Sequence, residues 1–147
     1  MKKYIVTIIA LFIIMSSTKT MAQSSFLSKA VITSFATQFE KASDVSWKIT
    51  DNFNKATFRI NNQYMDAFFS NEGTLIAMSH NVLSTELPIQ LQLGIMKNYP
   101  GTWISDLFEY VVDGNSSYYI TLENKDEKFI LESTDNSDWH LYKRTIK

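Results

Sequence analysis

Short segments in which apolar and polar residues alternate constrain the fold of this chain more than any other feature. Ala56, Phe58 and Ile60 alternate with polar neighbours, a pattern that predicts a β-strand with one covered face. Asn61-Asn62 suits a two-residue hairpin turn because asparagine tolerates positive φ, and the pairing would set Phe58 opposite Met65. By the same reasoning, we expect strands at 45–49, 55–60, 63–70, 74–80, 107–112, 118–123, 128–133 and 139–144.

Two segments have helical spacing instead. Each contains apolar residues three or four positions apart, which predicts an amphipathic helix with one face against a core. The first stripe is Leu27, Val31, Phe35 and Phe39. The second is Ile89, Leu93 and Met96, in a helix that would start near Thr85–Pro88 and end at Pro100-Gly101.

The two halves of the chain resemble each other. An offset of 64 residues places Phe58 on Leu122 and keeps five apolar positions apolar in both halves. We therefore predict an α+β fold of two tandem helix-plus-four-stranded antiparallel sheet repeats, about 27–80 and about 85–146. The helices would cover one face, with Leu75 and Ala77 beneath them, and the other would be an open sheet that carries Met78 and His80. A chain that alternates helices and strands can also match itself loosely without any repeat.

The open face is the candidate binding surface. An antiparallel sheet covered on one side normally exposes polar residues on the other, but this face is rich in aromatic and other apolar side chains. Aromatic residues, methionine and arginine are enriched in protein contact surfaces. The alternative is that the chain's own tail or a second copy covers the face. The candidate binding residues are Arg59, Tyr64, Phe68, Ile76, Met78, Tyr119 and Tyr142.

The N-terminus has the order of a secretory signal peptide. Basic Met1–Lys3 precedes the apolar run Tyr4–Met15, and small residues precede a predicted cleavage after Ala22. A membrane anchor is the alternative, but spanning a bilayer takes about 20 apolar residues. Cleavage of 1–22 would leave 11 basic against 15 acidic residues, a net charge of −4 in place of −1. We predict a periplasmic or secreted protein, domain 23–147, that contacts neither nucleic acid nor, after cleavage, a membrane.

No motif for catalysis, metal or cofactor binding stands out. The chain has no cysteine, only two histidines and only four glycines, so thiolate sites and glycine-rich phosphate loops are excluded. His80 and His140 lack the further ligands that a zinc site needs. We therefore expect a protein that is not an enzyme and that has no metal or cofactor.

Seven residues carry a family resemblance: Phe39, Ala42, Val45, Trp47, Ala56, Phe58 and Gly73. Spaced as they are behind a signal peptide, they resemble the PepSY-like proteins of Bacteroidetes, which are similar in fold to the beta-lactamase-inhibitor protein. The resemblance covers about Val31 to Ile146, although Glu40 stands where the family usually has proline. It implies a binding or inhibitory role and transfers no functional residue, because Trp47 and Gly73 would serve core packing and a turn.

Together these observations predict an exported, non-enzymatic module that contacts a protein or peptide through its open sheet face. The alternatives are an inhibitor of a secreted hydrolase, which rests on analogy of fold alone, and a carrier of a small apolar ligand. The sequence leaves the oligomeric state open.

Overall fold

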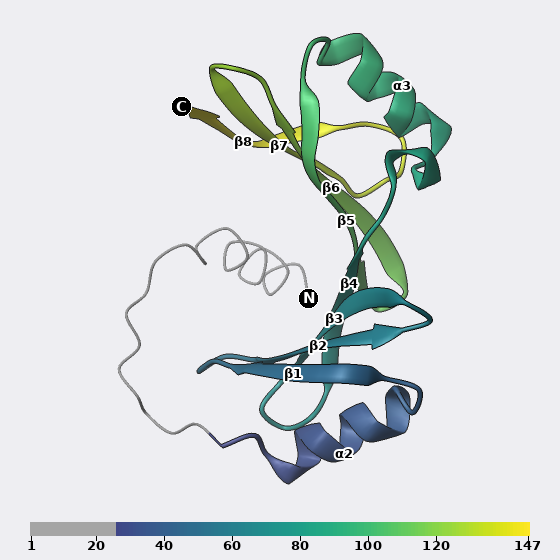
Figure 1. Cartoon of the computed structure of the whole chain (residues 1–147), viewed down its shortest axis with the longest axis vertical. Coiled ribbons are helices and arrows are strands. Elements are labelled where there is room, and N and C mark those ends of the chain that lie inside the picture. The colour runs from purple at the N-terminus through teal and green to yellow at the C-terminus, as the bar shows by residue number, and fades with distance from the viewer. Residues whose placement is uncertain (1–25) are drawn as a thin grey trace.

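Eight strands and two α-helices make up the structure, a computed structural model that describes residues 26–147 (Figure 1). The predicted signal peptide and its cleavage site lie outside the described residues. In chain order the elements are α2 (Lys29–Gln38), β1 (Ser43–Ile49), β2 (Asn54–Ile60), β3 (Gln63–Phe69), β4 (Leu75–Asn81), the 3-10 turn η1 (Ser84–Glu86), α3 (Ile89–Asn98), β5 (Trp103–Val112), β6 (Asn115–Glu123), β7 (Glu127–Ser133) and β8 (His140–Ile146).

The strands form one continuous antiparallel sheet in the order β1 to β8. The predicted α+β fold of two tandem helix-plus-four-stranded repeats is therefore wrong: the fold is mostly β, with two helices. The halves join where β4 pairs with β5, from Met78 opposite Val111 to Asn81 opposite Phe108. This pairing removes two edges that separate four-stranded sheets would leave exposed, and unpaired edges invite aggregation.

Both helices pack on the same face of the sheet. Val31 and Phe35 of α2 are buried against Ala56, Phe58 and other side chains of β2 and β3. Leu91 of α3 is buried in a second cluster, formed mainly by leucine and isoleucine from β5, β6 and β7. Figure 1 shows the sheet twisting between them, so that α2 and α3 lie at opposite ends of the molecule.

Local features explain where α2 begins and how it meets the sheet. The Ser28 hydroxyl caps α2 by accepting a hydrogen bond from the Val31 amide. Gly73 lies in the turn before β4 with φ +92°, and a Cβ there would approach the Ala30 backbone to 2.8 Å. The predicted roles of Gly73 in a turn and of Trp47 in the core are both confirmed, because Trp47 packs on Phe35 with ring centroids 5.2 Å apart.

The hairpin between β2 and β3 has the predicted register. Phe58 pairs with Met65 across a turn in which Asn61 and Asn62 both have positive φ. The register then shifts between β3 and β4, where Phe68 pairs with Ala77 but Phe69 pairs with Leu75. This β-bulge reverses the sides expected for the rest of β4.

Three of the predicted side-chain positions on β4 are therefore wrong. Met78 pairs with Ala67 and His80 with Met65, so both lie on the helix-bearing face and not on the open one. Ala77, which we placed beneath the helix, packs in the cluster on the opposite face.

Helix α3 buries a different stripe from the predicted one. Its Ile89, Leu93 and Met96 are 60%, 51% and 74% exposed, whereas Leu91 is fully buried. The helix begins at Ile89, directly after the predicted start at Thr85–Pro88, because Ser84–Glu86 forms a 3-10 turn closed by the Glu86 carboxylate on the Leu83 amide at 2.6 Å. Gly94 faces the Trp139 ring, and the Trp139 indole donates to the Leu91 carbonyl at 2.9 Å.

Candidate functional site

The face of the sheet opposite the two helices, here called the open face, carries a cluster of aromatic side chains. No residue of α2 or α3 takes part in it. Ile76, Phe108, Val112 and Tyr142 pack around its edge and are half-buried. The buried members, here called the aromatic floor, are Phe53, Phe68, Ala77, Tyr110 and Tyr119.

Ring-to-ring contacts connect the two halves of the molecule across the open face. The Phe68 ring on β3 lies 6.2 Å from the Tyr110 ring on β5, centroid to centroid. Phe108 stacks on Tyr119 at 5.3 Å with an interplanar angle of 14°, and Tyr142 on β8 meets Tyr119 edge-on at 6.3 Å. Such pairs stabilise by about 0.5–1.5 kcal/mol beyond the area they bury. The open face is thus a second core as well as a surface.

The predicted binding residues divide into buried and accessible ones. Phe68 and Tyr119 are only 1% and 3% exposed, and neighbouring side chains of the sheet pack against them, whereas no residue of α2 or α3 does. Ile76 and Tyr142 are half-buried, and Tyr64 is 60% exposed. The structure thus places six of the seven candidates on the open face, and Met78 on the other. The six are Arg59, Tyr64, Phe68, Ile76, Tyr119 and Tyr142.

Two buried tyrosines of the floor differ in their polar contacts. The Tyr119 hydroxyl donates to the Glu132 carboxylate at 2.5 Å, whereas the buried Tyr110 hydroxyl has no hydrogen-bond partner among the described residues. Burial raises the pKa of Tyr110 to about 12. Burial first, and then the hydrogen bond to Glu132, raises the pKa of Tyr119 further. Both side chains therefore stay neutral at physiological pH.

Charged side chains occupy the open face around β2 and β3. The Lys55 ammonium lies 2.9 Å from the Asp66 carboxylate, which also accepts a hydrogen bond from the Thr57 hydroxyl at 2.5 Å. Arg59 pairs with Asp44 at 2.7 Å and is partly exposed. The exposed Arg59–Asp44 pair stabilises the fold by at most about 1 kcal/mol, so Arg59 can exchange partners at low cost, whereas the Lys55–Asp66 pair is largely buried.

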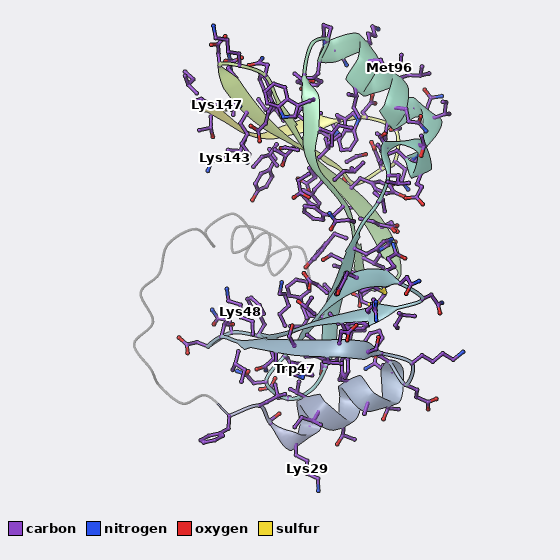
Figure 2. All side chains as sticks on the ribbon, in the orientation of Figure 1. Lys29, Trp47, Lys48, Met96, Lys143 and Lys147 are labelled. Atoms are coloured by element: carbon purple, nitrogen blue, oxygen red, sulfur yellow. The ribbon has the colours of Figure 1, made fainter. Side chains whose placement is uncertain are left out.

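The sequence pattern did not identify two lysines on the edge strands as residues of the open face. Lys48 pairs with Lys55 in the register of β1 and β2, and Lys143 pairs with Ile130 in that of β7 and β8. Directly paired residues of an antiparallel sheet project to the same face, which places both lysines on the open face. Figure 2 shows Lys48 on the side of β1 away from α2, and Lys143 on the same side of the molecule. Alternation within 45–49 could have placed Lys48, but the bulge at Tyr142 hid Lys143.

The histidines do not come together. His80 lies on the helix-bearing face with its Nε2 3.5 Å from a Glu109 carboxylate oxygen, whereas His140 pairs with Glu132 on the edge strand β8. Within residues 26–147, no group of three or more histidine, aspartate or glutamate side chains is arranged to hold a metal ion. Neither described helix is long and apolar enough to cross a bilayer.

Comparisons with known proteins place the fold. No family model matches the sequence, and no curated protein matches it. Among solved structures, a DUF2874 family protein from Bacteroides uniformis has a TM-score of 0.72 at 12% identity, covering 82% of this chain and 90% of its own. A Bacteroides eggerthii protein, provisionally described as periplasmic, has a TM-score of 0.71 at 8% identity, with coverage of 83% and 90%.

A third similar structure is described as a BLIP-like protein, from Bacteroides fragilis. It has a TM-score of 0.69 at 12% identity and covers 84% of this chain and 89% of its own. Identities this low establish the fold and not the activity. The chain therefore shares the fold of the BLIP-like and DUF2874 proteins of Bacteroides.

Proposed function

We propose that this chain is an exported, non-enzymatic binding module whose open face contacts a protein or peptide. The observation that supports it most is the aromatic surface that neither helix covers, bordered by the exposed Tyr64 and the half-buried Ile76 and Tyr142. Residues of these types are what protein contact surfaces are enriched in. The export of the chain rests on the sequence of residues 1–22 and on the fold shared with a protein provisionally described as periplasmic.

A second candidate function is inhibition of a secreted hydrolase. The fold shared with a BLIP-like protein favours it, as does the resemblance to the PepSY-like family. An inhibitor of this kind would use the same open face, because that is where aromatic side chains and the exposed Arg59–Asp44 pair lie together. A small-ligand carrier is less favoured, because Phe68 and Tyr119 already fill the aromatic floor.

Site-specific photo-crosslinking tests the proposal. A photoreactive residue would be placed at Tyr64 or Tyr142 on the open face, and at Lys29 or Met96 on the outer surfaces of the helices as matched controls. Irradiation in an envelope extract, followed by mass spectrometry, should give one dominant partner from the open-face positions only. Equal yields of the same adduct from the helix positions would contradict the proposal.

The identity of the crosslinked partner distinguishes a binding module from an inhibitor of a hydrolase. If the partner is a hydrolase, the purified chain should slow its turnover in proportion to the amount of complex formed. An unchanged rate in the saturated complex would exclude inhibition and leave a binding module.

A further inference from the structure

The two edge strands each present an exposed lysine to the open face. Lys48 comes from β1 and Lys143 from β8, so these cations lie on the two outermost strands of the face that carries the aromatic floor (Figure 2). Both side chains are exposed. An apolar centre with a cation on each side is thus built from strands that are remote in sequence.

Neither lysine has a salt bridge within residues 26–147, whereas the other cations of this face do. Lys55 pairs with Asp66, and Lys128 and Lys147 share Glu123. Lys48 and Lys143 are therefore the cations of the open face that remain available for a carboxylate from another molecule.

Lys48 also lies directly opposite Lys55, whose charge Asp66 already balances, so Lys48 is the cation of this pair that an external carboxylate can reach. Lysines on edge strands also discourage edge-to-edge aggregation, but that role does not depend on which face they occupy. Here both occupy the open face.

We propose that the occupant of the open face is an acidic segment of a partner protein. An apolar side chain of this segment packs against Ile76, Phe108 and Tyr142 at the edge of the aromatic floor, and flanking carboxylates pair with Lys48 and Lys143. This inference rests on the proposed function and adds the chemistry of the partner. Complementary charge of this kind steers association and selects the partner.

Synthetic peptides provide the probe. Each has a central leucine-phenylalanine pair with two glutamates on either side of it. Two, four or six residues separate the central pair from the glutamates. Matched peptides carry glutamine or lysine in place of each glutamate. Fluorescence anisotropy should show at least tenfold tighter binding of one glutamate peptide than of its glutamine counterpart, and binding should weaken as salt is raised. Lys48→Glu and Lys143→Glu should each weaken it about tenfold.

Two control variants carry the same charge reversal elsewhere. Lys29→Glu and Lys97→Glu lie on α2 and α3, are exposed, and should leave the affinity unchanged. Thermal melting of every variant establishes that it is folded. Amide chemical shifts of a labelled sample should change around Ile76 and Tyr142 when the glutamate peptide is added.

The outcomes separate this inference from the proposed function. Equal binding of the glutamate and glutamine peptides at the open face would overturn the acidic partner and leave the binding module intact. Shifts confined to the helices, or no binding of any peptide, would contradict both. Equal binding of polyglutamate or a DNA oligonucleotide would overturn the inference by showing a general affinity for polyanions.

Discussion

The two helices cover opposite ends of one sheet, but they do so with different chemistry. Beneath α2 the core is aromatic: the Phe35 ring contacts Phe39, Phe58, Trp47 and Phe69 at centroid distances of 5.1 to 6.3 Å. Beneath α3 the buried core is aliphatic, with leucine or isoleucine at each fully enclosed position. Large rings bury more area per residue and depend on orientation, whereas aliphatic side chains adapt more easily to a change of shape.

The outer surfaces of the helices also differ. Helix α2 exposes mainly lysine, threonine and alanine, with Ile32 as its large apolar residue, whereas α3 exposes Ile89, Leu93 and Met96. In α2 the apolar side of the helix is therefore the buried side, whereas in α3 the apolar stripe Ile89, Leu93 and Met96 is exposed. A periodic apolar stripe predicts a helix in both cases, but it identifies the buried face only in α2.

The largest expected effect tests the difference between the two cores. Phe58→Ala removes a fully buried ring that contacts Phe35 and Phe39, and should lower the free energy of unfolding by about 3–5 kcal/mol. Leu122→Ala in the aliphatic core should cost less, about 2–3 kcal/mol, because its neighbours can close around the cavity. Urea denaturation of both variants measures the costs. An equal or larger cost for Leu122→Ala would remove the distinction.

Glycine substitutions sharpen the contrast between the turn under α2 and the one after α3. Gly73→Ala should cost about 2–4 kcal/mol, because left-handed φ is strained for alanine and the new methyl group meets the Ala30 backbone. Gly101→Ala has the same type of φ but open space around it, so about 1–2 kcal/mol is expected. Thermal or urea unfolding compares the two. Equal costs would show that α2 can move away from the turn.

Alkaline pH tests the aromatic floor that links the two halves. Tyr110 has a pKa raised to about 12, so between about pH 10 and 12 the unfolded chain loses this proton while the folded chain keeps it. Stability is therefore full below about pH 10 and falls as the pH rises, by about 3 kcal/mol from this residue. The urea midpoint should decline less steeply with rising pH in Tyr110→Phe than in the unchanged protein. An identical slope would contradict the raised pKa of Tyr110.

Removing the hydroxyl group of Tyr110 and that of Tyr119 should have different effects on stability at neutral pH. Tyr119→Phe removes a hydrogen bond to Glu132 and should cost about 1 kcal/mol. Tyr110→Phe removes a buried hydroxyl that has no partner among the described residues, and should be neutral or slightly stabilising. The free energies of unfolding at pH 7 decide, and a loss for Tyr110→Phe would point to a water that satisfies its hydroxyl.

The smallest effect concerns the outer surface of α3. Met96→Gln should change stability by less than about 0.5 kcal/mol, because the side chain is 74% exposed. The buried neighbour Leu91→Gln is the matched control and should destabilise strongly. A large loss for Met96→Gln would mean that the predicted stripe is covered after all, for example by a second copy, and sedimentation of both variants would detect this.

Part of the candidate site could be predicted from the sequence. The alternation in 55–60 and the Asn61-Asn62 turn place Arg59, Tyr64 and Phe68 on one face, as the observed register does. Met78 could not be placed, because one extra residue at Ile76 reverses the sides after it. Lys143 was hidden in the same way by the bulge at Tyr142. Bulges depend on how neighbouring strands twist and pair, and single-sequence patterns do not contain that information.

Local sequence determined the strands, their turns and the buried stripe of α2, because alternation and side-chain spacing act over a few residues. Tertiary structure decided which face of α3 is buried, since Trp139 packs on Gly94 and its indole binds the Leu91 carbonyl. It also joined the two halves through β4 and β5 and enclosed Phe68 and Tyr119. These outcomes depend on which segments remote in sequence come together. A free sheet edge or an apolar face favours contact but does not specify which segment makes it.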